Sequence, residues 1–342
     1  MLAGLANRPV RIRNFLWAQD CISTIGCLRT LGVKADRLVN NDLIVEGKGL
    51  YGLTEPVNVL DAGNSGTTMR LLAGILAGQP FMSVMTGDDS LRQRPMGRVI
   101  APLSQMGGRI YGREKSRYAP LVFLPADSLH AVSYHSPVAS AQVKSALLLA
   151  GLYADGPTRV SEPALSRNHT ELMLETFGVR LERQDATVTV FPCEELNAPE
   201  EIAVPGDISS AAFWLVAATI IPGSKLVIKN IGINPTRTGI LDVLHRMGAH
   251  ITLANYRHAG KEPVADMEIE ASRLVATTID ADILPRLIDE IPVLAVAALF
   301  ADGRTVISGA EELRVKETDR LRALVTELGK MGAQITETAD GL

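Results

Sequence analysis

The sequence predicts an α/β protein made of two domains of repeated units. An amphipathic helix that ends at a glycine and leads into a short strand recurs five times along the 342 residues. A second helix, apolar on nearly all sides, recurs with the same period, which is typical of helices buried between layers. Strands that alternate with helices predict α/β layers. A polar, proline-containing stretch over 191–207 follows the third repeat, so we expect a first domain over 1–200 and a second over 201–342.

The amphipathic helices are recognised by their last residues. A glycine directly after the last helical residue predicts a left-handed C-cap. The glycines lie about 70 to 84 residues apart, the spacing of one repeat, and they are Gly32, Gly107, Gly178, Gly248 and Gly332. A short strand is expected after each of them, including a strand after Gly332.

The apolar helices are followed by a turn with Gly or Pro and then by a strand. This pattern occupies 69–87, 144–163, 212–231 and 293–310. The opening segment "LAGLANRPVRIRNFL" aligns with the end of the first of them, "LAGILAGQPFMSVMTG", and so predicts the tail of a helix followed by a strand. A helix without its start lacks its cap. We therefore expect the chain to begin inside one repeat and to end inside another, truncated at both ends.

Composition and charge exclude several classes of function. Hydrophobic residues make up 46% and charged residues 21%, with a net charge of -4 and no basic stripe, which argues against a nucleic-acid partner. No apolar run of about 18 residues predicts a membrane span, and the first residues lack signal-peptide features. Three cysteines without metal-ligand spacing fit a reducing, cytoplasmic setting. The dinucleotide and P-loop glycine motifs and metal-ligand clusters are missing from the sequence.

Arginines and small polar residues precede the helices at equivalent places in the repeats. Arg94, Arg167, Arg237 and Arg320 stand just ahead of the amphipathic helices, where the first repeat has Asp20. The apolar helices begin with small polar residues, namely Asn64, Ser65, Gly66, Thr67, Ser140, Gln142, Asp207, Ser209 and Ser210. Helix N-termini and arginine forks bind phosphates and carboxylates. If the repeats converge, they form a cleft for small polyanionic ligands; otherwise these residues cap helices or are solvated.

Other charged residues have two interpretations each. Asp289 and Glu290, with Lys316, Glu317 and Arg320, combine carboxylates with cations, which suits proton transfer beside a bound anion. The alternative is a solvated, charged loop. His169 is a general base or a structural histidine, and Lys144 is a ligand contact or part of a solvated helix face.

Seven motifs in order resemble one family, the EPSP synthases (3-phosphoshikimate 1-carboxyvinyltransferases). They are "DAGNSGTTMRLL", "LRQRPMGRVIAPL", "ASAQVKSALLLAGL", "SRNHTE", "PGDISSAAFWLVAA", "NPTRTG" and "EELRVKETDRL". Three of them resemble the class II, often glyphosate-tolerant branch. The resemblance implies an inside-out α/β barrel of two domains and six βαβαββ repeats, of which this chain holds four near-complete ones and part of a fifth.

The resemblance also implies an activity and its partners. The family transfers the enolpyruvyl group of phosphoenolpyruvate to the 5-hydroxyl of shikimate 3-phosphate through a tetrahedral intermediate, and releases phosphate, in aromatic amino acid biosynthesis. It needs no metal or organic cofactor. A monomer that binds these two small molecules, and neither nucleic acid nor membrane, is expected.

The resemblance assigns roles to residues of this chain. The residues implied for shikimate 3-phosphate are Ser140, Ala141, Gln142, Arg167, Asp289 and Lys316. The residues implied for phosphoenolpyruvate are Asn64, Gly66, Thr67, Arg94, Gln142 and Arg320. Asp289, Lys316 and Glu317 are the implied catalytic residues, with Asp289 on the 5-hydroxyl and Glu317 in proton transfer. Gly66 occupies the position at which a methyl group would crowd glyphosate.

Two departures from the family pattern limit what is expected of this chain alone. The family's N-terminal Lys-Ser…Arg cluster and its sixth repeat are absent from the sequence. Losing one buried charge contact costs about 2–5 kcal/mol, so the isolated chain is expected to be inactive or nearly so. A non-catalytic remnant that binds small anions is one alternative. The other is a UDP-N-acetylglucosamine enolpyruvyl transferase, which usually has a cysteine in the loop that corresponds to 81–94, where this sequence has none.

Overall fold

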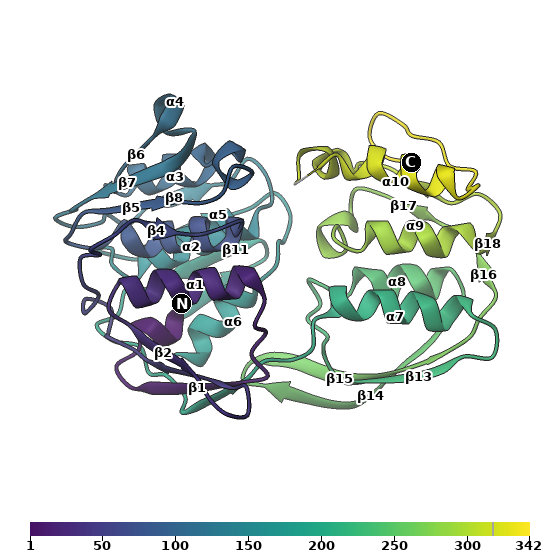
Figure 1. The fold of residues 1–342 in the computed structure, drawn as a ribbon, viewed down its shortest axis with the longest axis horizontal. Coiled ribbons are helices and arrows are strands. Elements are labelled where there is room, and N and C mark those ends of the chain that lie inside the picture. Colours follow the sequence, from purple (N-terminus) through teal and green to yellow (C-terminus); the bar gives the residue numbers. More distant parts are fainter. Residues whose placement is uncertain (317) are drawn as a thin grey trace. The chain divides into compact units, whose positions relative to one another are not determined.

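The computed structural model describes residues 1–316 and 318–342 and divides them into two compact units (Figure 1). Unit 1 spans Met1–Val204 and unit 2 spans Pro205–Leu342. The division falls inside the polar stretch 191–207. Each unit has a hydrophobic core of its own.

Unit 1 contains three four-stranded sheets with one common strand order. In each sheet a parallel pair is extended by an antiparallel hairpin. The sheets are β12 (Glu201–Ala203), β1 (Pro9–Arg13), β3 (Leu43–Glu46), β2 (Lys34–Arg37); β4 (Leu60–Asp61), β5 (Ser83–Thr86), β7 (Tyr118–Leu124), β6 (Arg109–Gly112); and β8 (Ser133–His135), β9 (Thr158–Ser161), β11 (Thr187–Val190), β10 (Leu181–Gln184). This threefold recurrence confirms the repeat read from the sequence. In the first sheet, the strand parallel to β1 comes from the end of the unit.

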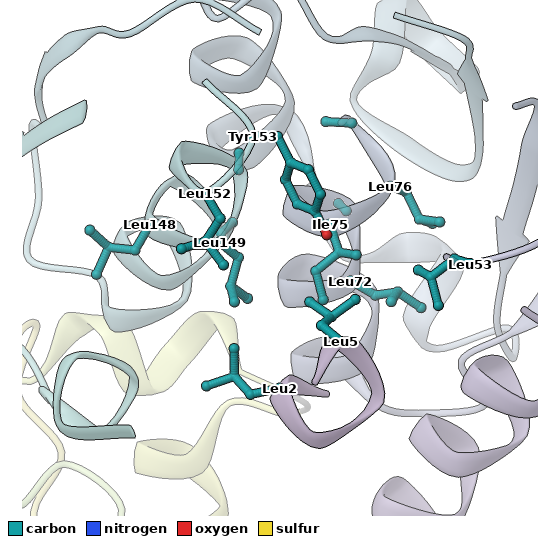
Figure 2. Packing of buried hydrophobic residues seen from close by; sticks show 14 of the residues in the cluster. Leu2, Leu5, Leu53, Leu72, Ile75, Leu76, Leu148, Leu149, Leu152 and Tyr153 are labelled. Atoms are coloured by element: carbon teal, nitrogen blue, oxygen red, sulfur yellow. The ribbon is translucent and has the colours of Figure 1, made fainter. Parts of the chain in front are cut away.

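The apolar helices form the centre of unit 1. They are η1 (Leu2–Leu5), α2 (Gly66–Leu76) and α5 (Ala141–Gly151). Figure 2 shows Leu2 and Leu5 of η1 gathered with leucines of α2 and α5 in one buried cluster. The other helices are α1 (Gln19–Thr30), η2 (Leu91–Gln93), α3 (Gly97–Gln105), the left-handed turn α4 (Arg113–Ser116) and α6 (His169–Thr176). The apolar helices lie inside and the sheets outside, which is the expected inside-out arrangement. The opening segment forms the predicted helical turn and strand, η1 and β1.

The predicted C-caps are present in all five repeats. Gly32, Gly107, Gly178, Gly248 and Gly332 have φ values of 88°, 95°, 78°, 89° and 90°. A side chain disfavours this left-handed conformation, whereas glycine adopts it at little cost. The glycines therefore turn the chain out of each amphipathic helix.

Unit 2 repeats the same scheme with fewer strands. Gly206 pairs in parallel with β13 (Lys225–Gly232), which continues antiparallel to β15 (Glu262–Glu270) and β14 (His250–Ala259). Two short parallel pairs follow, β16 (Leu274–Val275) with β18 (Ala301–Asp302) and β17 (Thr278–Ile279) with β19 (Val306–Ile307). The helices are α7 (Ile208–Ile220), α8 (Gly239–Arg246), η3 (Leu284–Arg286), α9 (Ile291–Leu299), η4 (Glu311–Val315) and α10 (Arg320–Lys330).

Two expectations for unit 2 are wrong. Helix α7 is not buried all round, since Phe213 and Trp214 are 63% and 66% exposed, and Phe213 lines an apolar groove with residues of α9 and α10. The strand expected after Gly332 does not form within the described residues 333–342. In the other four repeats, the strand that follows the glycine pairs with the next strand along the chain, as β2 pairs with β3 and β14 with β15. Residues 333–342 contain no such partner strand. The backbone of Leu342 instead exchanges two hydrogen bonds with Ile307.

Candidate functional site

The start of α2 gathers predicted anion-binding residues of unit 1. Ser65 caps the helix by accepting the Thr68 N–H at 3.1 Å. The Asn64 amide donates to Asp88 Oδ2 at 2.6 Å, and its oxygen accepts a hydrogen bond from Arg94 Nη2 at 2.7 Å. The Asn64 amide and the Leu91 N–H hold the pKa of Asp88 below its usual value, so this carboxylate stays charged and orients Asn64. The structure thus brings Asn64 and Arg94 together.

A second arginine completes this cluster, and the sequence analysis assigned it no role. Arg70 is buried in α2 and donates to Gln142 Oε1 at 2.7 Å, while Gln142 Nε2 donates to Thr67 Oγ1 at 3.1 Å. A Cβ at Gly66 would lie 2.9 Å from Arg70 Nη1 and 3.4 Å from Arg94 Nη1. Two guanidinium groups therefore flank the N-terminus of α2, where the helix dipole also favours an anion. The signal was present, because an arginine inside an apolar helix is rarely buried without a function for its charge.

The start of α5 carries Ser140, Ala141 and Gln142 side by side. Ser140 is the N-cap residue, and its own N–H donates to Glu162 Oε1 at 2.7 Å. Arg167 lies in the segment between β9 and α6, two residues ahead of His169, which opens α6. Gln142 is thus the residue that joins the start of α5 to the cluster at α2.

Lys144 is not part of a solvated helix face, so that interpretation of the sequence is wrong. It is 2% exposed, with Nζ 3.0 Å from Glu162 Oε2 and 2.9 Å from Glu171 Oε1. An amphipathic pattern could not reveal this, because the carboxylates that compensate the lysine come from segments further along the chain.

In unit 2, Asp289 and Arg320 come together. Arg320 Nη1 donates to Asp289 Oδ1 at 3.2 Å, across an interval of 31 residues. Lys316 donates to Glu312 Oε1 at 3.0 Å, one helical turn earlier in the chain. Glu317 lies outside the described residues. Unit 2 therefore presents a carboxylate–guanidinium pair at the start of α10.

Glu290 and Arg237 belong to a second cluster of charged side chains in unit 2. Arg237 donates to Asp207 Oδ1 at 3.1 Å and to Ser209 Oγ, and it lies 3.8 Å from Glu290 Oε1. Burial raises the pKa of Asp207, but the Arg237 charge and the Ser210 donors outweigh burial and hold it below its usual value. Glu290 is 1% exposed, so the alternative of a solvated, charged loop is wrong for this residue.

Residues 1–316 and 318–342 contain neither a candidate metal site nor a candidate membrane span. Within these residues, His, Cys, Asp and Glu form no group of three that could hold a metal ion. No helix in the described part of the chain has the length and apolar character to cross a membrane.

The three thiols are expected to react slowly in the folded chain. Burial raises the pKa of Cys21 to about 11 and that of Cys27 to about 12, and it also raises the pKa of Cys193. A rise of two pKa units leaves about a hundredfold fewer thiolates at pH 8, and the thiolate is the reactive form. Titration with Ellman's reagent should release the chromophore slowly from native chain and quickly in denaturant. A thiol that reacts at the same rate in both states would contradict this prediction.

The fold and the candidate site together indicate the class of protein to which the chain belongs. The chain is an inside-out α/β protein of βαβαββ repeats, with arginines and amides gathered at helix starts, as suits the binding of small phosphorylated or carboxylated molecules. The model of the family "EPSP synthase (3-phosphoshikimate 1-carboxyvinyltransferase)" matches residues 1–342. The chain belongs to the EPSP synthase family.

Individual relatives agree with this assignment. Proteins named 3-phosphoshikimate 1-carboxyvinyltransferase from Desulforudis audaxviator and Gloeothece citriformis are 55% and 56% identical over the whole chain, which covers 79% and 77% of their lengths. The solved EPSP synthase from Acinetobacter baumannii is 42% identical with a TM-score of 0.90, over 99% of this chain and 76% of that one. The predicted family and fold class are confirmed, and the UDP-N-acetylglucosamine alternative is not favoured.

Proposed function

We propose that this chain provides the residues for enolpyruvyl transfer from phosphoenolpyruvate to the 5-hydroxyl of shikimate 3-phosphate, with release of phosphate. One observation carries the proposal beyond the family assignment. The Arg94–Asn64 and Arg70–Gln142 hydrogen bonds, both 2.7 Å, hold two guanidinium groups beside the start of α2 through contacts within the protein itself. A site that is organised in advance spends less binding free energy on ordering its side chains.

Phosphoenolpyruvate would lie against the start of α2. The Arg94 guanidinium would bind one anionic group of phosphoenolpyruvate. The side chains of Asn64 and Thr67 would form hydrogen bonds with the same ligand. Gly66 would let the ligand approach the helix backbone, since this residue has no side chain. Gln142 connects this position to α5 and would touch both substrates.

Shikimate 3-phosphate would be held by Ser140, Ala141 and Gln142 at the start of α5 and by Arg167. A hydroxyl, helix N–H groups and a guanidinium fork are together well suited to a phosphate. The carboxylate of Asp289 would accept a hydrogen bond from the 5-hydroxyl group.

The proton transfers would fall to residues of unit 2. In the addition step the substrate oxygen bonds to C2 of phosphoenolpyruvate while C3 gains a proton; in the elimination step C2 loses phosphate and C3 returns the proton. Asp289 would take the hydroxyl proton, and Arg320 and Lys316 would balance the negative charge of the ligands. The role of Glu317 in moving the C3 proton rests on the family resemblance alone.

Equilibrium binding and turnover of the chain test this function. Titration calorimetry should show binding of shikimate 3-phosphate and tighter binding of phosphoenolpyruvate once the first ligand is present. Any phosphate that the chain releases, even at a very low rate, should then require both substrates. A chain that folds but binds shikimate 3-phosphate only weakly would favour the non-catalytic remnant instead.

Replacing Gly66 with Ala is expected to weaken phosphoenolpyruvate binding. The new Cβ would meet Arg70 Nη1 at 2.9 Å and disturb its bond to Gln142. Loss of a hydrogen bond to a charged group costs about 1.5–3 kcal/mol, which corresponds to a rise in Kd of about 10- to 150-fold. The matched control is Gly97→Ala at the start of α3, where a Cβ would meet no atom within 4 Å among the described residues. Equal Kd values for the two variants, measured at saturating shikimate 3-phosphate, would overturn the assignment of Gly66 to the site.

We also propose that the protein is a cytoplasmic monomer. The free state of Cys21, Cys27 and Cys193 supports a reducing compartment. The monomer rests on the family resemblance, and light scattering at micromolar concentration tests it directly.

A further inference from the structure

Unit 1 contains a buried ionic cluster that the proposed mechanism does not use. Lys144 of α5, Glu162 after β9 and Glu171 of α6 have side chains that are 2%, 1% and 3% exposed. The Lys144 ammonium contacts one oxygen of each glutamate, at 3.0 Å and 2.9 Å. Burying ionised groups is costly unless each has a partner. One lysine neutralises one glutamate, so charge balance alone does not explain why the second is there.

The hydrogen bonds that Glu162 accepts explain why this glutamate is present in addition to Glu171. Its Oε1 accepts the Ser140 N–H at 2.7 Å, and its Oε2 accepts the Ser166 hydroxyl at 2.7 Å. Ser140 begins α5, and Ser166 directly precedes Arg167. One buried carboxylate therefore ties together the two segments that carry the proposed contacts to shikimate 3-phosphate.

We infer that Glu162 is a positioning residue for shikimate 3-phosphate, an inference that rests on the proposed function. Charge-assisted hydrogen bonds are short, strong and directional, and they are stronger still in a buried site. Through them Glu162 sets the place of the Ser140 backbone and of the turn before Arg167. Lys144 holds Glu162 in turn, and Glu171 contacts the same ammonium group.

The variant Glu162→Gln tests this role. Glutamine keeps the shape of the side chain, but its bond to the Ser140 N–H is no longer charge-assisted, and its NH₂ group would face the Lys144 ammonium. The Kd for shikimate 3-phosphate is expected to rise about tenfold. The Kd for phosphoenolpyruvate at saturating shikimate 3-phosphate should rise less than the Kd for shikimate 3-phosphate, since Asn64 and Arg94 lie on other segments and Gln142 alone of its proposed contacts lies on α5.

Glu171→Gln is the matched control. It removes the other carboxylate from the same lysine, at 2.9 Å, but among the described residues Glu171 forms no hydrogen bond with Ser140 or Ser166. Its melting temperature should fall as that of Glu162→Gln does, while its Kd for shikimate 3-phosphate stays within about twofold of wild type. Equal Kd shifts in both variants, or no shift in Glu162→Gln, would overturn the inference.

Two further measurements separate the possible failures. If wild-type chain binds no shikimate 3-phosphate, the proposed function fails; if it binds and Glu162→Gln binds equally well, only the inference fails. Should Glu162→Gln not fold, Ser166→Ala removes the 2.7 Å hydroxyl bond to Oε2 and keeps all three buried charges. A Kd rise of about threefold is then expected, and an unchanged Kd overturns the inference.

Discussion

Replacing Lys144 with Met is expected to lower the free energy of unfolding of unit 1 by about 3–5 kcal/mol, the cost of removing one partner from a buried ion pair. Methionine has a similar length and fills irregular space well, so packing changes little. The loss comes from Glu162 and Glu171, which remain buried without their common cation. This is the largest effect that we expect from a single side chain outside the proposed site.

The measurement is urea unfolding followed by tryptophan fluorescence. Trp17 lies in unit 1 and reports on Lys144→Met in a chain that also carries Trp214→Phe. The 66% exposed Trp214 lies in unit 2 and reports on the control variant in a chain that carries Trp17→Phe. Lys225→Met is the control, because Lys225 pairs with Glu270 at 2.7 Å but with side chains 78% and 55% exposed. Exposed pairs contribute about 0–1 kcal/mol. Equal losses from the two lysines, each measured in its own unit, would show that burial does not decide the effect.

Replacing Gly74 with Ala is expected to destabilise unit 1 by about 3 kcal/mol or more, at the upper end of the cost of overpacking. A Cβ at this position would lie 2.1 Å from the Ala146 carbonyl oxygen and 2.9 Å from its carbon. Both atoms belong to the backbone of α5, so the clash is not relieved by rotating a side chain. Helices α2 and α5 would have to separate, and they carry Asn64 and Gln142 of the proposed site at their starts.

Gly26→Ala in α1 is the matched control for this substitution. A Cβ at Gly26 would meet no atom within 4 Å among the described residues. Alanine is favoured over glycine in a helix by about 1 kcal/mol, so this variant should be as stable as wild type or more so. The same urea experiment compares the two. A Gly74→Ala chain with wild-type stability would mean that α2 and α5 do not approach each other as described.

Local sequence patterns were enough to predict the repeats and much of the site. The glycine that ends each amphipathic helix has a positive φ at all five positions, because a C-cap depends on the conformation of a single residue. Asn64, Thr67 and Gln142 were found by motif, and the structure joins them through Arg70 and Arg94. Motifs reveal such residues because their spacing along one helix start is encoded locally.

By itself, then, the sequence determined the α/β repeats, the C-caps, the family and the residues at the helix starts. Only the tertiary structure decided which charged side chains are buried and which residues they contact. Lys144 is neutralised by glutamates 18 and 27 residues further along the chain, and Glu290 is buried against Ser209, 81 residues away. The strand expected after Gly332 has the local pattern of a strand but does not form one. Burial and strand pairing depend on segments that are distant in sequence, and no pattern within one helix or strand contains that information.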